Sequence, residues 1–248
     1  MARNILKSRA YHDADALFAC SDLAGKWLYG KRREEKTYYI LKNAINVDEF
    51  KFDKKKREKI RAELNINCKF TMGTVGRLTP QKNPYCILEI AKEFCAIHPN
   101  SVFLWVGKGE LEGDIKSKAV DMGIGDNIIF TGVRADIPSL LSAMDVFVFP
   151  SLWEGLPVSV IEAQASGLPC LISDTITDEV CVSPLIKPLS IENNVQEWVN
   201  EIEKIEETPY RMDVSEMIRN AGYAIKDSAE WISDFYMSCY RNIRGEFI

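Results

Sequence analysis

Residues 145–173 read DVFVFPSLWEGLPVSVIEAQASGLPCLIS and decide the fold class of this chain. Residues 145–150 and 169–173 are short runs that are apolar almost throughout, which is typical of parallel strands covered on both faces. Residues 158–166, between the two runs, have the pattern of a helix. The segment therefore predicts a strand, a helix and a second strand, which is the βαβ unit of a parallel sheet.

The same alternation continues on both sides of this unit. Further strands are predicted at residues 70–76, 102–107 and 127–131, with a weaker one near 184–188. Further helices are predicted at 111–122, 137–143, 198–205 and after Asn83-Pro84, where Asn is a favourable cap and Pro a favourable first residue. We therefore expect an α/β fold with a doubly wound, Rossmann-like parallel sheet, whose ligands bind beyond the carboxyl ends of the strands.

The two ends of the chain differ from this pattern. Residues 1–50 contain candidate strands at 16–20 and 37–41 but too few elements to build a core, so we interpret them as the remnant of a neighbouring domain. The main domain is predicted at residues 51–222. Residues 223–248 are predicted to form a C-terminal helix with Trp231, Phe235 and Tyr236 on its apolar side.

The densest basic run is Lys54-Lys55-Lys56-Arg57, followed by Lys59 and Arg61. Acidic residues are interleaved with these cations. This pattern favours a solvated helix face over a patch that binds a membrane or phosphate.

Composition argues against several classes of protein. The chain has 248 residues and a net charge of −5, which does not fit a nucleic-acid partner. Its seven cysteines and two histidines show no spacing of metal ligands, which argues against a zinc enzyme. Scattered free cysteines fit a reducing cytoplasm. We find no apolar run long enough to span a membrane, and residues 1–9 do not resemble a signal peptide.

The loop after the first main-domain strand carries two cations. Arg77 and Lys82 stand at either end of a short segment that follows Gly76 and precedes the helix at Asn83-Pro84. Two fixed cations beside a helix N-terminus would suit a diphosphate. The alternative is that both side chains face solvent.

A second loop carries two acids. Glu154 lies in the turn after the strand at 145–150, and Glu162 lies eight residues later in the following helix. Ionised carboxylates only accept hydrogen bonds, which suits pairs of sugar hydroxyls. The alternative is a capping carboxylate at Glu154 and a partly exposed Glu162.

These loops contain short motifs in a fixed order: Gly76-Arg77-Leu78 with Lys82, Phe149-Pro150-Ser151, Glu154 with Glu162, and Gly167-Leu168-Pro169. Together they resemble the C-terminal, donor-binding domain of family-4 glycosyltransferases, which are retaining enzymes of the two-Rossmann-domain (GT-B) type. Residues 173–179 are most similar to the bacterial exopolysaccharide and capsule branch. Residues 41–50 resemble the linker that joins the family's N-terminal acceptor domain to its donor domain.

The resemblance implies that a sugar moves from a nucleotide-diphosphate sugar, most commonly a UDP-sugar in this branch, to a polysaccharide or lipid-linked acceptor with retention. It implies that Arg77 and Lys82 hold the diphosphate, and that Glu154 contacts the donor sugar as the third catalytic residue. Similar enzymes need no metal, because cations and helix dipoles stabilise the leaving group. The implied donor-binding residues are Gly76, Gly107, Gly109, Val133, Arg134, Gly155, Leu156, Val158 and Glu162, with Glu162 on the ribose and the Val133-Arg134 turn against the base.

The chain departs from the family pattern because most of the N-terminal domain is missing from it. One alternative is therefore a catalytically incomplete nucleotide-sugar-binding subunit of a split or truncated enzyme. We expect self-association or a partner that supplies the N-terminal domain, and contact with the inner face of the membrane if the acceptor is lipid-linked. A dinucleotide-dependent oxidoreductase is disfavoured, because Gly107-x-Gly109 lacks the third glycine of that fingerprint.

Overall fold

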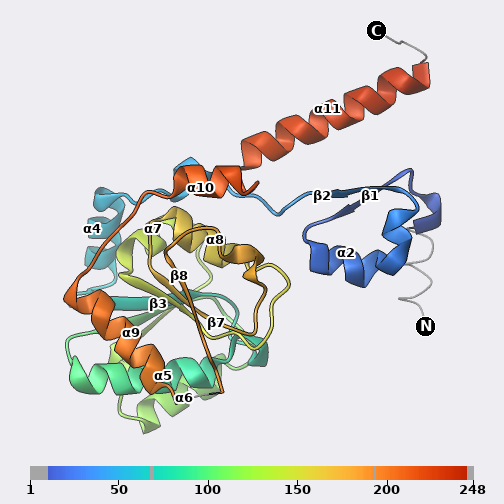
Figure 1. Ribbon diagram of the computed structural model, residues 1–248. Coiled ribbons are helices and arrows are strands. Elements are labelled where there is room, and N and C mark those ends of the chain that lie inside the picture. Colours follow the sequence, from blue (N-terminus) through green and yellow to red (C-terminus); the bar gives the residue numbers. More distant parts are fainter. Residues whose placement is uncertain (1–10, 68–69, 193, 245–248) are drawn as a thin grey trace. The chain divides into compact units, whose positions relative to one another are not determined.

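The computed structural model describes residues 11–67, 70–192 and 194–244. The chain divides into two compact units, one of Val47–Ile218 and one of Met1–Asn46 with Arg219–Ile248. Figure 1 shows the helices and strands of both units. The first ten residues of the predicted 1–50 remnant, including the segment considered for a signal peptide, lie outside the described residues.

The larger unit is built on a six-stranded parallel sheet with the order β5-β4-β3-β6-β7-β8. The strands are β3 (Thr71–Val75), β4 (Val102–Val106), β5 (Ile128–Gly132), β6 (Val146–Phe149), β7 (Cys170–Ser173) and β8 (Ile186–Leu189). The chain runs outward from β3 to β5 and then returns to the other side of β3. This is the doubly wound topology that the sequence predicts, and it places the switch point between β3 and β6.

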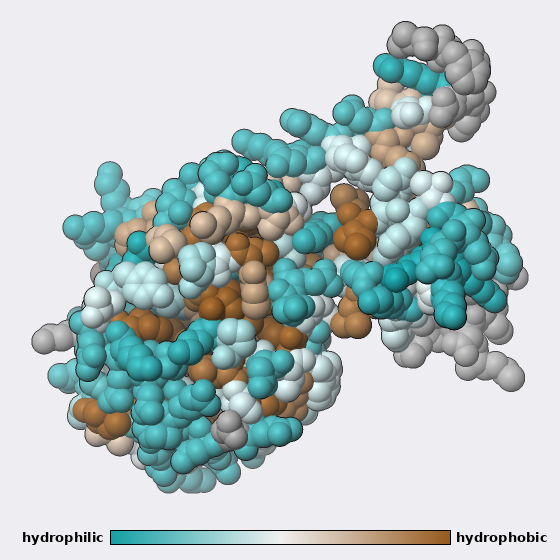
Figure 2. Space-filling view, in the orientation of Figure 1, coloured by the Kyte–Doolittle hydropathy of each residue, from teal (hydrophilic) through white to brown (hydrophobic). Residues whose placement is uncertain are grey.

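Helices cover both faces of this sheet (Figure 1). One face carries α5 (Pro84–Ile97), α6 (Glu112–Asp121) and α9 (Gln196–Glu207). The other carries α3 (Val47–Phe50), α4 (Lys54–Glu63), α7 (Ile137–Ala143) and α8 (Val158–Ala165). Hydrophilic residues cover most of the visible outer surface around α5 and α6, as expected for helices that bury only one side (Figure 2).

The core shows why the apolar stripe after Asn83 forms a helix. Ile87, Leu88 and Phe94 of α5 are completely or almost completely buried against Phe103 of β4 and Trp198 of α9. The predicted start of this helix is confirmed, but the capping role is wrong. Asn83 has a left-handed backbone with φ 51°, and its side chain makes no capping hydrogen bond.

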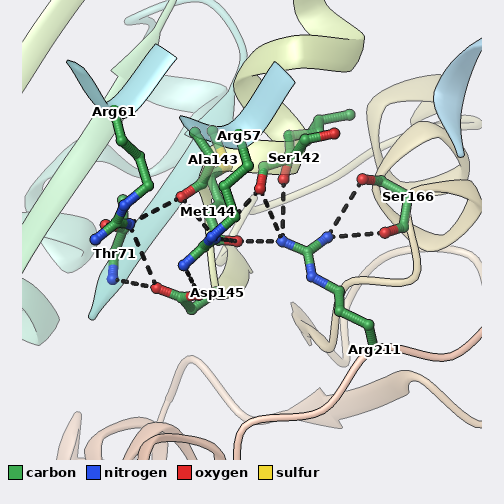
Figure 3. A network of polar contacts seen from close by, with 10 residues as sticks. Arg57, Arg61, Thr71, Ser142, Ala143, Met144, Asp145, Ser166 and Arg211 are labelled. Atoms are coloured by element: carbon green, nitrogen blue, oxygen red, sulfur yellow. Dashed lines mark hydrogen bonds and ion pairs between the residues drawn. The ribbon is translucent and has the colours of Figure 1, made fainter. Parts of the chain in front are cut away.

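The predicted solvated face of α4 is wrong for two of its arginines (Figure 3). Arg57 donates to the carboxylate of Asp145 at 2.7 Å and to the carbonyl oxygens of Ala143 and Met144, both at 3.0 Å. Arg61 donates to the Ala143 carbonyl at 3.2 Å. The last carbonyls of a helix lack partners within it, so these guanidinium groups satisfy the C-terminal end of α7 and tie α4 to it.

Arg211 completes this network from the segment that follows α9 (Figure 3). It donates to the carbonyl oxygen of Met144 and, at 2.8 Å, to that of Ser166 just after α8. Burial, together with the nearby charge of Arg57, lowers the pKa of Arg211 to about 10. The guanidinium therefore stays protonated at neutral pH while it joins the ends of two helices.

The smaller unit has a two-stranded parallel sheet of β1 (Ala16–Ala19) and β2 (Thr37–Ile40), with α2 (Asp22–Tyr29) and α11 (Ile225–Arg244). The rings of Phe18 and Tyr39 contact Trp231 and Phe235, so two of the three residues predicted on the apolar side of the C-terminal helix pack on the predicted strands. The third, Tyr236, is 64% exposed. The short α10 (Ser215–Asn220) spans the boundary between the units. Boundaries at 46/47 and 218/219 compare with 50/51 and 222/223 expected from sequence.

Candidate functional site

Backbone hydrogen bonds join the loops at the carboxyl ends of β3, β4 and β5. The Gly76 amide donates to the Val106 carbonyl at 2.9 Å, and the Gly107 amide donates to the Gly132 carbonyl at 2.9 Å. The Leu78 amide donates to the Lys108 carbonyl at 3.3 Å. Three loops that are distant in sequence thus form one continuous rim on the side of the sheet where ligands of this fold bind.

Two glycines of this rim have no space for a side chain. Gly107 has φ +138°, and a Cβ atom there would lie 2.1 Å from the Gly76 carbonyl oxygen. A Cβ atom on Gly109 would lie 2.2 Å from the Leu78 carbonyl oxygen. The close approach at both glycines is to neighbouring backbone, so they are needed to build the rim; their contact with a donor stays a prediction.

Lys82 and Glu154 meet at this rim although they come from different strand ends. Lys82 Nζ lies 2.6 Å from Glu154 Oε1, and the two side chains are 18% and 10% exposed. The ammonium group also lies 4.4 Å from the centroid of the Phe149 ring at the end of β6. Gly76 leaves room for the lysine side chain, because a Cβ atom there would lie 3.2 Å from Lys82 Cε. The alternative of a solvated Lys82 is therefore excluded in this structure.

Arg77 differs from Lys82. It follows Gly76 directly and precedes the fully buried Leu78, which anchors the loop, but Arg77 itself is exposed. The structure thus places one of the two predicted cations against an acid and leaves the other at the solvent-facing edge of the same loop.

Glu162 lies on α8 and is only partly exposed. Burial raises the pKa of its carboxyl. Within the described residues, no hydrogen bond or ion pair to this carboxylate is found. A partly desolvated carboxylate without a partner is costly, which makes Glu162 suited to accept hydrogen bonds from a ligand.

The turn between Glu154 and Glu162 leads into the N-terminus of α8. Gly155 has open space around its Cα atom, and no side chain caps the helix, which begins at Val158 after Pro157. Leu156, which lies between these residues, is half-buried. An uncapped helix N-terminus offers backbone N–H groups and a favourable dipole to an anion.

The Val133-Arg134 turn after β5 presents only one of its two side chains. Val133 is 77% exposed. The Arg134 guanidinium instead donates to both oxygens of Asp136, each at 2.8 Å, and to Glu63 at 2.7 Å. The Arg134 side chain is thus engaged by protein carboxylates, while that of Val133 is free of such contacts and exposed; the contact of this turn with a base stays a prediction.

Two further residues hold the Glu154 loop and were not singled out from sequence. Gln81 Nε2 donates to the Trp153 carbonyl at 2.8 Å, and Thr175 Oγ1 donates to the Leu152 carbonyl at 2.8 Å. Their only sequence signal is position, since each lies in a loop that follows a strand.

The part of the chain that the structure describes has neither a metal site nor a membrane span. No group of three or more Cys, His, Asp or Glu side chains there is arranged to hold a metal ion. None of the helices in those residues has the length and apolar character that crossing a bilayer requires.

Comparison with known proteins fits this geometry. Residues 56–224 match the family described as "Glycosyl transferases group 1". The chain is 35% identical over 215 residues to the UDP-Gal:alpha-D-GlcNAc-diphosphoundecaprenol alpha-1,3-galactosyltransferase of Escherichia coli, an alignment that covers 82% of this chain and 54% of that protein. It is 31% identical over 229 residues to the putative glycosyltransferase EpsF of Bacillus subtilis, covering 90% of this chain and 60% of that one.

The fold has matches among solved structures. The crystal structure of Anabaena Alr3699/HepE in complex with UDP and glucose superposes with a TM-score of 0.75 at 19% identity, covering 95% of this chain and 66% of that chain. The chain spans little more than half the length of the E. coli and B. subtilis relatives. A family match over residues 56–224 takes in most of the chain and the whole of the rim at the strand ends, and the chain therefore belongs to the group 1 glycosyltransferases.

Proposed function

We propose that this chain binds a nucleotide-diphosphate sugar, with uridine as the base, and forms the donor-binding part of a retaining glycosyltransferase. The contact between Lys82 and Glu154 carries the proposal, since it joins a cation and an acid from two strand ends at the ligand-binding side of the sheet. Glu162, without a protein partner among the described residues, follows on the next helix.

In this proposal each site residue meets one part of the donor. Lys82 and Arg77 hold the diphosphate, the exposed Arg77 from the outer edge of the loop. Glu154 accepts hydrogen bonds from donor-sugar hydroxyls, and Glu162 accepts those of the ribose. The backbone at Gly155, Leu156 and Val158 contributes N–H groups, while Val133 lies against the base.

The chemistry requires these charges. Transfer of a glycosyl group develops positive charge on the sugar and negative charge on the departing diphosphate. Cations fixed beside the diphosphate stabilise this separation more in the transition state than in the ground state, which is how they accelerate the reaction. Arg77 and Lys82 therefore fill the role that a metal ion fills elsewhere, and we propose a reaction that needs no metal cofactor.

The relatives support the donor and acceptor classes. The name of the E. coli relative gives UDP-Gal as donor and a diphosphoundecaprenol-linked sugar as acceptor. The HepE crystal structure is that of a complex with UDP and glucose. We accordingly propose a polysaccharide or lipid-linked saccharide as the acceptor, and a place for this chain in the cytoplasm at the inner face of the membrane.

Calorimetric titration tests donor binding. The chain is titrated with UDP, ADP, GDP and CDP, and then with UDP-glucose, UDP-galactose and UDP-N-acetylglucosamine. We expect UDP and at least one UDP-sugar to bind, and Glu162→Ala and Lys82→Ala each to weaken UDP binding by about 10-fold or more, as expected for a lost charge-assisted hydrogen bond. Glu110→Ala is the control, since Glu110 is exposed in the loop after β4.

Two outcomes of these titrations would contradict the proposal. Binding of UDP that Glu162→Ala leaves unchanged would contradict the ribose contact. The absence of binding to every nucleotide and nucleotide-sugar would contradict the donor-binding function as a whole.

A second candidate function is that of a nucleotide-sugar-binding subunit that transfers nothing by itself. It is favoured by the coverage of relatives, of which this chain spans 54% and 60%. In that case a partner, or a further part of the polypeptide, supplies the acceptor-binding domain. Transfer from the bound UDP-sugar by the purified chain alone would rule this candidate out.

A further inference from the structure

The backbone just before Glu154 is held from two sides. Carbonyl oxygens of two consecutive residues, Leu152 and Trp153, accept hydrogen bonds from side chains of other loops, and the Ser151 carbonyl lies close to the same threonine hydroxyl as that of Leu152. Thr175 Oγ1 lies 3.3 Å from the Ser151 oxygen and 2.8 Å from that of Leu152, and Gln81 Nε2 lies 2.8 Å from that of Trp153. The Leu152 amide returns a bond to the Gln81 carbonyl at 2.9 Å.

These bonds fix the orientation of the peptide that leads into Glu154. A peptide group is planar, so a carbonyl that is held in place also fixes the N–H of the next residue. The Trp153 carbonyl and the Glu154 amide belong to one such plane. Gln81 from the β3 loop therefore holds the peptide plane that contains the Glu154 amide, and Thr175 from the β7 loop holds the plane before it, between Leu152 and Trp153.

The Thr175 hydroxyl is itself oriented. Its oxygen lies 2.7 Å from Ser173 Oγ, which also accepts from the Thr175 amide at 3.1 Å. A threonine hydroxyl has one proton to donate. That proton goes to the Leu152 carbonyl, so the hydroxyl of the buried Ser173 must donate to Thr175 Oγ1. Ser173 at the end of β7 thus donates to Thr175, and Thr175 donates to the loop before Glu154.

We propose that Thr175 and Gln81 are positioning residues that set how strongly the site distinguishes a sugar-bearing nucleotide from the bare nucleoside diphosphate. They act through Glu154, the acid assigned to the donor sugar, and the inference rests on that proposed function. Thr175 lies on a strand end separate from Arg77 and Lys82, so its loss affects the contact with the sugar and leaves the contacts with the diphosphate in place.

Three variants at two positions test this. Thr175→Val keeps the shape of the side chain without the hydroxyl, Thr175→Ser restores the hydroxyl, and Gln81→Met removes the side-chain donor while the backbone carbonyl at position 81 remains. Thr177→Val is the matched control, because Thr177 lies in the same loop and its hydroxyl accepts from the Glu179 amide instead. Glu154→Ala gives the value expected when the sugar contact is absent.

The measurement is the ratio of the Kd for UDP to the Kd for the UDP-sugar that the wild-type chain binds most tightly among UDP-glucose, UDP-galactose and UDP-N-acetylglucosamine. We expect Thr175→Val and Gln81→Met to move this ratio about fivefold towards that of Glu154→Ala, the effect of one ordinary hydrogen bond. For Thr175→Val, which is remote from Lys82 in the chain, the Kd for UDP itself should stay within about twofold of the wild-type value. Thr175→Ser and Thr177→Val keep the wild-type ratio.

Each outcome decides a different point. A wild-type ratio in Thr175→Val would overturn the positioning role, as would an equal weakening of UDP and UDP-sugar binding, which a general loss of structure produces. A ratio that Glu154→Ala leaves unchanged would instead overturn the assignment of Glu154 to the sugar, and with it this inference.

Discussion

At the scale of single residues, the ion pair of Lys82 and Glu154 determines the electrostatics of the site. The carboxylate lies 2.6 Å from the ammonium that we assign to the diphosphate, so it partly neutralises the charge that attracts a bare nucleoside diphosphate. A nucleotide-sugar also carries sugar hydroxyl groups, which can donate hydrogen bonds to the Glu154 carboxylate.

Glu154→Gln should therefore bind UDP more tightly than the wild-type chain, by severalfold, and should lose its preference for a UDP-sugar over UDP. Calorimetry of both ligands checks this expectation. Glu110→Gln removes the same charge from an exposed position in the loop after β4 and serves as the control for net charge. Weaker UDP binding by Glu154→Gln would contradict the idea that this carboxylate offsets the charge of Lys82.

We expect the ionised Glu162 side chain to lower the free energy of unfolding of the ligand-free chain while it strengthens the binding of UDP. Burial raises the pKa of its carboxyl in the folded chain, so the folded state favours the protonated form. Its contribution to stability is complete below the unfolded pKa and is lost as the pH rises through the folded pKa. At neutral pH the ionised carboxylate therefore lowers the stability of the protein when no ligand is bound.

Glu162→Gln should consequently be more stable than the wild-type chain at pH 7. The two should differ least at low pH, well below the pKa of the unfolded state, where the carboxyl is protonated in both states. The same variant should bind UDP about 10-fold or more weakly, because a charged acceptor is lost. Denaturant unfolding at both pH values measures the first effect and calorimetry the second. A difference in stability that does not depend on pH would refute the explanation.

At the scale of helices and strands, the sequence predicted the strands of the sheet far better than the side-chain hydrogen bonds and ion pairs that join the elements, called polar supports below. The strands of the larger unit were predictable because each is a short apolar run bounded by turn residues, as at residues 145–150. The sequence also indicated that Lys82 and Glu154 lie near each other, because both follow strands and the carboxyl ends of parallel strands share one edge of the sheet.

The polar supports depend on partners that are remote in sequence. Arg57 was assigned to solvent because its neighbours are charged, yet its partner Asp145 lies 88 residues away. The bonds from Gln81 and Thr175 to the Glu154 loop span 72 and 23 residues. No local pattern records such distances. Asn83 shows a further limit, because its residue type fits a cap while its left-handed backbone prevents the capping bond.

Asp145 is expected to matter for stability and not for ligand binding. Its carboxylate accepts from Arg57 at 2.7 Å and from the Thr71 amide at 2.8 Å, at the amino end of the sheet and therefore on the side away from the proposed site. Asp145→Asn leaves the partly buried guanidinium groups of Arg57 and Arg61 without their counter-charge and should cost about 3 kcal/mol of unfolding free energy.

Denaturant unfolding measures this loss. Asp114→Asn is the control, since Asp114 accepts an exposed bond from Tyr85 and its replacement should cost less than about 0.5 kcal/mol. The Kd for UDP, where Asp145→Asn is folded, should equal that of the wild-type chain. Equal stability of the two variants would show that the arginine network contributes little.

At the scale of the whole molecule, the smaller unit has a short sheet and exposed apolar side chains. In the described residues its sheet consists of β1 and β2, and each strand pairs with the other alone. Leu23 and Ile40 are 52% and 44% exposed. Open strand edges beside exposed apolar side chains favour association with another chain.

We therefore expect the purified chain to self-associate at micromolar concentration, as measured by sedimentation velocity. If a partner domain covers this surface, its addition should replace the self-association by a complex of the two. Leu23→Lys should weaken the association, because it places a charge on the exposed side of α2. Val120→Lys on α6, a similarly exposed position of the larger unit, should leave it unchanged. A monodisperse monomer for the wild-type chain would contradict the expectation.

The contacts at Gly107 and Gly109 have a consequence for altering the base of the nucleotide that we propose this domain binds. Because a single methyl group at either position would collide with the backbone of the adjacent loop, both codons should tolerate almost no replacement in a saturation library, whatever nucleotide is supplied for selection. Diversity is better directed to Val133, whose side chain already projects into solvent and can be exchanged without disturbing the hydrogen-bonded rim.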